Sequence, residues 1–162
     1  MGLFPCSAGR YYWFTSSNTE TDFSHWPRPF PQVMAATPPG AILRNEIIDR
    51  PPIRNWGLGS VTLLGDAAHP TTPNLGQGAC MALEDAVTLA AFLARSGNPA
   101  AHLRAWEKSR YARTSWITNE SWRTGKMLQM THPLAIKARN TFMGHRLTGA
   151  LTRRLFRQML GA

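Results

Sequence analysis

The 162-residue sequence contains no apolar run that approaches the roughly 20 residues needed to cross a bilayer as a helix. Its first 14 residues lack the basic start and the long apolar segment of a secretory signal peptide. It has only two cysteines, Cys6 and Cys80, which are far apart and form no metal-binding or redox motif. These absences predict a cytoplasmic protein with two free thiols and no metal site, for which membrane association is not expected.

Acidic residues are few: nine aspartates and glutamates face eighteen lysines and arginines, which gives a formal net charge of +9. A basic protein can bind nucleic acid by neutralising phosphates. Here the arginines are scattered from Arg10 to Arg157, and no nucleic-acid recognition motif accompanies them. The charge therefore indicates at most a loose attraction to anions, and we expect no nucleic-acid partner.

The composition, 43% hydrophobic and 17% charged, is typical of a folded globular chain. The aromatic-rich segment 10–15 predicts a strand. Prolines in 25–39 are expected to prevent regular helix through much of that region. Segment 42–49 mixes apolar and polar residues in a way compatible with a short strand. The first part of the chain is therefore expected to contribute strands rather than long helices.

From residue 61 the pattern becomes strand, loop and helices. The short apolar run 61–64 predicts a strand covered on both faces. Segment 79–94 is apolar nearly all round, which predicts a buried helix. A second helix is expected over 101–130, followed by shorter ones over 134–143 and 147–160. The sequence therefore predicts a mixed α/β fold with a helical C-terminal region.

The most informative segment, 65–79, joins the predicted strand to the first long helix. Asp66 would follow the carboxyl end of the strand, where open α/β sheets bind ligands, and it could accept hydrogen bonds from sugar-like hydroxyls. Gly76 and Gly78 permit unusual backbone angles and leave backbone amides unshielded. Free amides at a helix N-terminus favour an anionic group. Physical reasoning alone therefore predicts a loop that binds an anion or a polyol.

The loop also resembles the second FAD-binding motif of the flavoprotein aromatic hydroxylases, the salicylate and p-hydroxybenzoate hydroxylase family. The matching positions are Gly65-Asp66-Ala67-Ala68-His69, Pro73, Gly76-Gln77-Gly78 and Ala82-x-Glu84-Asp85-Ala86. The flanking positions that agree are Asp49-Arg50-Pro51-Pro52, Trp56 and Trp106-Glu107-x-x-Arg110. The resemblance implies part of a flavin-dependent monooxygenase that hydroxylates a small aromatic or similar organic substrate with NAD(P)H and O2.

By this resemblance, Asp66 would bind the ribityl hydroxyls of FAD, and Pro73 would also lie beside the substrate. The amides at the start of the helix would face the N1/O2 edge of the flavin ring. The cofactor-binding residues so implied are Gly65, Asp66, Pro73, Gly76, Gln77, Gly78, Ala79 and Cys80. No side chain is assigned a catalytic role, because the cofactor carries the chemistry and the protein positions it.

Two motifs of the family have no counterpart in this sequence: the Gly-x-Gly-x-x-Gly segment that binds the pyrophosphate, and the middle Asp-Gly motif. We therefore expect an incomplete FAD-binding fold, a C-terminal part of the enzyme. Segment 1–50 would belong to a substrate-binding sheet, 51–130 to the FAD-binding domain and 131–162 to a helical tail. A complementary N-terminal chain would supply the remainder. One alternative is a non-catalytic remnant or interaction module without flavin; another is a protein that binds surfaces through its basic tail.

Several residues in and near the loop have a structural interpretation beside the functional one. Asp66 could instead cap the turn that follows it. His69 is expected to be structural and to bond backbone in the loop. Glu84 and Asp85 are adjacent, so they point about 100° apart on a helix, and we expect them to bond backbone or arginines rather than to form a catalytic pair. The thiol of Cys80 is expected to pack.

Two further segments leave alternatives open. The aromatic residues of 11–14 are expected to pack in the core, with lining of a substrate pocket as the alternative. The amphipathic segment 147–160 is expected to dock on the protein's own surface rather than on an anionic membrane.

Overall fold

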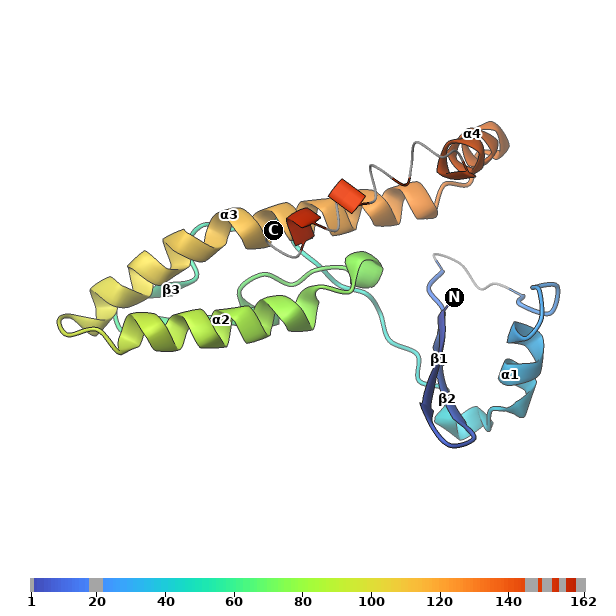
Figure 1. Ribbon diagram of the computed structural model, residues 1–162, viewed down its shortest axis with the longest axis horizontal. Coiled ribbons are helices and arrows are strands. Elements are labelled where there is room, and N and C mark those ends of the chain that lie inside the picture. Colours follow the sequence, from blue (N-terminus) through green and yellow to red (C-terminus); the bar gives the residue numbers. More distant parts are fainter. Residues whose placement is uncertain (1, 18–21, 145–148, 150–152, 155–156, 160–162) are drawn as a thin grey trace. The chain divides into compact units, whose positions relative to one another are not determined.

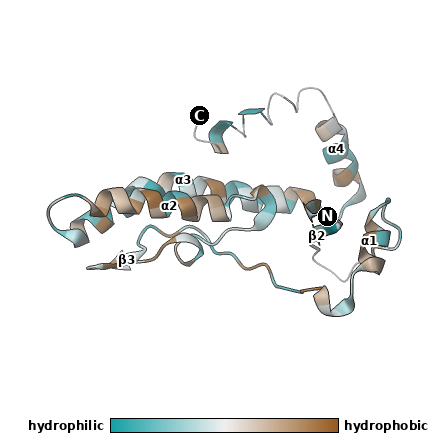
Figure 2. Ribbon diagram, turned by 60° about the horizontal axis from the view of Figure 1, so that its bottom comes forward, coloured by the Kyte–Doolittle hydropathy of each residue, from teal (hydrophilic) through white to brown (hydrophobic). Residues whose placement is uncertain are grey.

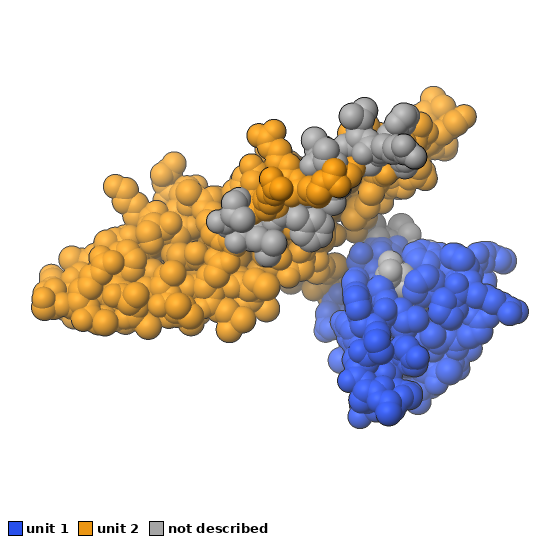
Figure 3. Space-filling view, in the orientation of Figure 1, with its two compact units in different colours: residues 1–45 blue, residues 46–162 orange. Residues whose placement is uncertain are grey.

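The computed structural model describes residues 2–17, 22–144, 149, 153–154 and 157–159 (Figure 1). The chain forms two compact units, Met1–Asn45 and Glu46–Ala162 (Figure 3). The division into segments 1–50, 51–130 and 131–162 stays a prediction.

The first unit is built on an antiparallel hairpin. Strand β1 (Gly2–Ser7) pairs with strand β2 (Arg10–Phe14), and Gly9, with a φ of 69°, lies in the turn between them. The Trp13 Nε1 donates a hydrogen bond of 2.9 Å to Thr37 Oγ1, which links the hairpin to the end of the helix that follows. The strand predicted over 10–15 is confirmed, whereas β1 was not predicted from the sequence.

The proline-rich region contains a helix after all. Helix α1 spans Phe30–Ala36, with Pro31 in its first turn, and the 3-10 turn η1 spans Pro39–Ala41. Pro31 is tolerated there because the amide it lacks would have no intrahelical acceptor in the first turn. The strand considered for 42–49 is wrong: this stretch is irregular, since no described strand pairs with it.

Three of the four aromatic side chains of β2 are exposed, and the fourth, Trp13, is partly buried. Tyr11, Tyr12 and Phe14 are 62%, 56% and 43% exposed. The expected core packing is wrong for these three residues, because none of the described residues forms a second layer over this part of the hairpin.

The second unit is organised around two long helices that lie side by side and antiparallel (Figure 1). Its elements are β3 (Gly57–Leu58), β4 (Val61–Thr62), η2 (Gly65–Ala67), η3 (Pro73–Leu75), α2 (Gly78–Leu93), α3 (Pro99–Leu128) and α4 (Pro133–Gly144). The helices predicted over 79–94, 101–130 and 134–143 are confirmed, within two residues at each end.

Local chemistry explains the turn between the two long helices. Gly97 has a φ of 121°, a conformation that favours glycine. Asn98 then caps α3, since its side chain accepts a hydrogen bond of 2.9 Å from the Ala100 amide, and Pro99 occupies the first turn.

The predicted tail helix, 147–160, lies largely outside the described residues. Residues 153–154 and 157–159 are helical. Met159 is buried, and its carbonyl accepts a hydrogen bond of 2.7 Å from Arg113 Nη2 on α3. This described end of the tail therefore lies against the protein's own helix.

A small core joins the loop to the helices. Trp56, Ala68 and Trp106 are buried together, and Leu64, Leu89 and Phe92 pack against them. The two indole rings meet edge to face, with centroids 5.6 Å apart. The Trp106 Nε1 also donates to Thr88 Oγ1 on α2 at 2.9 Å, so the core fixes α3 against α2.

The burial predicted for segment 61–64 and for α2 is wrong. Within 61–64 only Val61–Thr62 forms strand, and Val61 is 68% exposed. On α2, Leu83 and Val87 are 69% and 73% exposed, and the hydrophobic colouring of this helix is visible in Figure 2. One face of α2 packs on α3, but no described residue covers the face that bears these two side chains. Among the described residues, none of the helices has both the length and the apolar character that crossing a bilayer requires.

Candidate functional site

The loop that begins at Gly65 lies tightly against α2. Gly65 is buried and has a φ of 59°. A Cβ added to it would lie 3.1 Å from the Cβ of Ala82 on α2. Glycine is therefore required here both by the backbone conformation and by the close approach of the helix.

Asp66 presents its carboxylate at the surface of the loop. Its side chain is exposed, and no described residue donates a hydrogen bond to it. The alternative that Asp66 caps its own turn is therefore wrong. A Cβ added to Gly78 would lie 3.8 Å from Asp66 Oδ1, so the carboxylate sits beside the start of α2. It is available to accept hydrogen bonds from a ligand.

The start of α2 carries free backbone donors. Gly76, with a φ of 63°, ends the η3 turn, and its amide donates to the Pro73 carbonyl at 3.0 Å. Gln77 does not cap the helix with its side chain, and the first turn contains no acidic residue. Among the described residues, no acceptor bonds the three amides that follow, those of Gly78, Ala79 and Cys80.

These three amides and the helix dipole favour a group that is anionic or a strong hydrogen-bond acceptor. The N1–C2=O edge of a reduced flavin is such a group. Asp66, on the adjacent turn, complements it with acceptors for hydroxyl groups. The residues present therefore fit the ribityl chain and the flavin ring edge of FAD.

An arginine before the loop, Arg50, holds the loop through two backbone carbonyls. Arg50 donates from Nη2 to the carbonyl oxygens of Ala67 and Ala68, at 2.8 and 2.7 Å. Only the family resemblance pointed to Arg50, within Asp49-Arg50-Pro51-Pro52, and nothing in the spacing revealed its partner.

His69 and Asp85 form a buried pair beneath the loop. The His69 Nε2 lies 2.6 Å from Asp85 Oδ2, and the Gly65 amide donates to the same oxygen at 3.1 Å. Arg110 Nε donates to Asp85 Oδ1 at 2.7 Å. His69 is structural, as expected, but its ring bonds the Asp85 carboxylate rather than backbone. The expectation that Asp85 and Glu84 bond arginines or backbone is confirmed.

This ionic cluster changes the acidity of its carboxyl groups. Burial alone would raise the pKa of Asp85, but hydrogen bonds from His69 and Arg110 outweigh burial and lower it. The pKa of Glu84 is lowered chiefly by the hydrogen bonds from Arg113, and the same pairing raises the pKa of Arg113. Both carboxylates are thus held ionised as structural partners, which argues against a catalytic acid at either position.

Both cysteines are free and exposed. The prediction of two free thiols is confirmed, but the prediction that the Cys80 side chain packs is wrong. Cys80 lies in the first turn of α2, where no described residue covers it.

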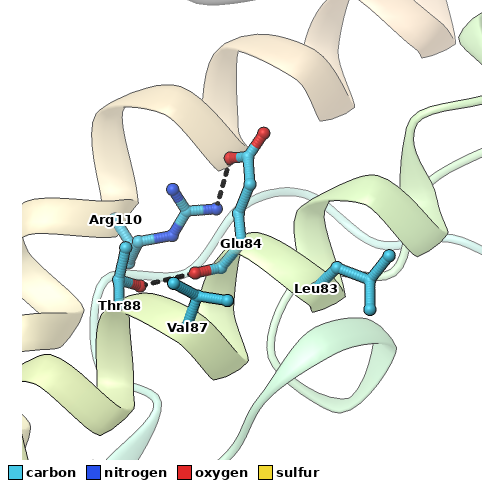
Figure 4. Close-up of a pocket in the computed structure, with 5 residues that line it drawn as sticks. All are labelled: Leu83, Glu84, Val87, Thr88 and Arg110. Atoms are coloured by element: carbon cyan, nitrogen blue, oxygen red, sulfur yellow. Dashed lines mark hydrogen bonds and ion pairs between the residues drawn. The ribbon is translucent and has the colours of Figure 1, made fainter.

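A shallow groove on α2 does not coincide with the predicted site. It is lined by Leu83, Glu84, Val87, Thr88 and Arg110. In Figure 4 Arg110 points toward Glu84, with which it forms an ion pair of 2.9 Å. None of the predicted cofactor-binding residues lines this groove, so it is separate from the predicted flavin site.

Comparison with known proteins agrees with the geometry of the loop. Residues 49–121 match the family described as FAD binding domain. The chain is 38% identical over 156 residues to aurachin C monooxygenase/isomerase of Stigmatella aurantiaca, covering 88% of this chain and 41% of that protein. It is 38% identical over 125 residues to the FAD-dependent urate hydroxylase of Klebsiella pneumoniae, covering 68% of this chain and 33% of that protein.

A solved structure shares the fold. Klebsiella pneumoniae HpxO complexed with FAD and uric acid superposes with a TM-score of 0.82 at 29% identity, over 98% of this chain and 44% of that one. The predicted fold class and the resemblance to FAD-dependent aromatic hydroxylases are thereby confirmed, and the matched family and the FAD complexes of HpxO agree with the prediction of FAD as the cofactor. The chain spans less than half the length of these proteins.

Proposed function

We propose, because this chain carries part of the FAD-binding fold of the flavin-dependent aromatic hydroxylases, that its loop from Gly65 to Cys80 binds the ribityl chain and flavin ring of FAD. The observation that supports this most directly is the pairing of two unsatisfied features. The free carboxylate of Asp66 lies beside the free amides that begin α2.

Each feature has a defined task in this proposal. Asp66 accepts hydrogen bonds from ribityl hydroxyls. The amides of Gly78, Ala79 and Cys80 donate toward the N1/O2 edge of the ring, where negative charge develops when the flavin is reduced. Bound flavin would supply the redox chemistry of a monooxygenase that uses NAD(P)H and O2, and the chain's own residues hold and orient it.

The substrate in this proposal is a small aromatic or similar organic molecule, placed near Pro73. Two observations support it. Uric acid is present with FAD in the HpxO structure. Pro73 is exposed and lies in the η3 turn, directly before Gly76 and Gly78. The carbonyl of Pro73 accepts the Gly76 amide, so the turn is closed by the chain's own hydrogen bond.

The dinucleotide-binding half of the FAD-binding domain would come from polypeptide other than these 162 residues. The protein would act in the cytoplasm. Leu83 and Val87 on α2, and Val61 on β4, are exposed apolar side chains of the kind that an adjoining layer covers. The relatives are more than twice as long as the aligned part of this chain. Both observations favour a complementary segment, whether on the same polypeptide or on a separate one.

Competition among flavin fragments tests which part of FAD is bound. Riboflavin carries the ribityl chain and ring, whereas ADP carries the pyrophosphate and adenosine. The proposal expects riboflavin to displace FAD from the chain at comparable concentration and ADP to have little effect. Displacement by ADP but not by riboflavin would instead place the affinity at the other end of the cofactor. The exposed apolar face also supports an alternative, a non-catalytic interaction module, which predicts no flavin binding at all.

A further inference from the structure

The flavin loop is attached to α3 through a set of hydrogen bonds that centres on Ser121. The Ser121 Oγ donates to the Thr72 carbonyl at 2.6 Å and lies 2.8 Å from Thr72 Oγ1. Asn74 donates from Nδ2 to the Ser121 carbonyl at 3.0 Å and to Thr72 Oγ1 at 2.9 Å. Ser121 is fully buried. Three side chains therefore satisfy one another across 49 residues of sequence.

The face of α3 beneath the loop is made of small residues, Thr114, Thr118, Ser121 and Gly125. Their spacings of four, three and four place them on one side of the helix, and all four are buried. A Cβ added to Gly125 would collide with the side-chain amide of Asn74. The absence of larger side chains lets the η3 turn lie directly on the helix.

This attachment lies close to the free amides in sequence. The η3 turn ends at Gly76, whose amide bonds the Pro73 carbonyl, and α2 starts two residues later. Only a few residues separate Asn74, which bonds the Ser121 carbonyl, from Gly78 at the start of α2. A shift of Asn74 would therefore be transmitted to the start of this helix.

We propose that Ser121 is a positioning residue for the flavin site. It fixes the turn from Thr72 to Asn74 and thereby holds the amides of Gly78, Ala79 and Cys80 in the orientation that the flavin edge requires. Ser121 touches no cofactor and acts through Thr72. The inference rests on the proposed function for the identity of the ligand, but the positioning itself belongs to the chain without ligand.

The test compares four variants of the full chain. Ser121→Ala and Thr72→Val remove the hydroxyl pair, Thr72→Ser retains it, and Ser109→Ala removes a hydroxyl on the same helix that bonds only the Trp106 carbonyl. Hydrogen exchange is measured without flavin at the amides of Gly76 and Met81, which are bonded and bracket the free ones. FAD dissociation constants are measured on the same samples.

Ser121→Ala and Thr72→Val should accelerate exchange at these two amides about tenfold or more, because each variant removes a hydroxyl that takes part in two hydrogen bonds. Exchange at the backbone amides of the Trp106 core should not change. A general loss of stability would instead accelerate exchange at these amides as well as at Gly76 and Met81. The two variants should also raise the FAD dissociation constant about tenfold. Thr72→Ser and Ser109→Ala should behave as the unsubstituted chain does.

Unchanged exchange at Gly76 and Met81 in a folded Ser121→Ala chain would overturn the positioning role. If that variant does not fold, the contrast between Thr72→Val and Thr72→Ser decides in its place. A chain that shows the exchange effect but binds no FAD would contradict the proposed function and leave the attachment of the loop established.

Discussion

Asp85 on α2 accepts a hydrogen bond of 2.7 Å from the Nε of Arg110 on α3, and its other oxygen is bonded by His69 and by the Gly65 amide. One buried carboxylate thus ties together both long helices and the base of the flavin loop. The position of the loop therefore depends on an ionic cluster whose members Asp85, His69 and Arg110 are buried.

Removal of this carboxylate should be strongly destabilising. Asp85→Ala would leave the Arg110 Nε, the His69 ring and the Gly65 amide buried without their acceptor, and breaking a buried pair in this way costs about 3–5 kcal/mol. Glu84→Ala should cost less, about 1 kcal/mol, because Glu84 is partly exposed and exposed pairs contribute little. Urea unfolding followed by circular dichroism measures both. Equal losses in the two variants would contradict the role assigned to Asp85.

Stability should fall on acidification. The pKa values of Asp85 and Glu84 are lowered in the folded state. The unfolded chain therefore binds more protons as the pH drops through the ordinary carboxyl range, about 4. The free energy of unfolding should be at its plateau above that pH and decline progressively below it.

The acid sensitivity can be assigned with one further variant. Asp85→Asn should flatten the decline of the unfolding free energy at low pH. Asp22, whose pKa is also lowered, contributes equally in the unsubstituted chain and in the variant. Urea unfolding at several pH values between 3 and 7, a range set by carboxyl titration, measures the slopes. The same slope below about pH 4 in both chains would exclude Asp85 as a source of the dependence.

Gly78→Ala should separate ligand binding from folding. The added methyl group meets only the Thr71 methyl group at 3.5 Å and Asp66 Oδ1 at 3.8 Å, so the free energy of unfolding should change by less than about 0.5 kcal/mol. The methyl group would nevertheless stand between Asp66 and the free amides, where the flavin must approach. FAD affinity should fall several-fold, and a titration measures it.

Two other glycines serve as controls for that experiment. Gly65→Ala should destabilise the chain, because its positive φ and the nearby Ala82 both disfavour a Cβ. Gly40→Ala meets nothing within 4 Å and should alter neither stability nor FAD affinity. An unchanged FAD affinity in folded Gly78→Ala would mean that the ligand does not approach these amides.

The sequence predicted the helices and the loop well, because local patterns determine them. The periodicity of 79–94 and 101–130 and the breakers between them place α2 and α3, and the glycines of the loop locate the free amides. The bonds that hold the loop could not be predicted in the same way. Arg50 reaches Ala67 across 17 residues and Ser121 reaches Thr72 across 49. The small-residue spacing on α3 is the signal that could have located the second of these.

Burial was the least predictable property. Segment 61–64 and α2 have the continuous apolar character of elements covered on two faces. The described residues provide only one covering layer, so Val61, Leu83 and Val87 remain exposed. An apolar sequence pattern indicates that an element is covered on both faces. It does not indicate whether the covering residues belong to these 162 residues.

In the proposed function the flavin loop binds FAD through Asp66 and the first amides of α2. The most direct measurement is a fluorescence titration of FAD into the purified chain, beside Asp66→Ala and the matched variant Glu46→Ala, which removes an exposed carboxylate outside the loop. FAD should bind saturably. Asp66→Ala should weaken binding by about tenfold or more, because a charged hydrogen-bond acceptor is lost, and Glu46→Ala should leave it unchanged. A folded chain that does not bind FAD, or that binds it equally well without the Asp66 carboxylate, would contradict the claim.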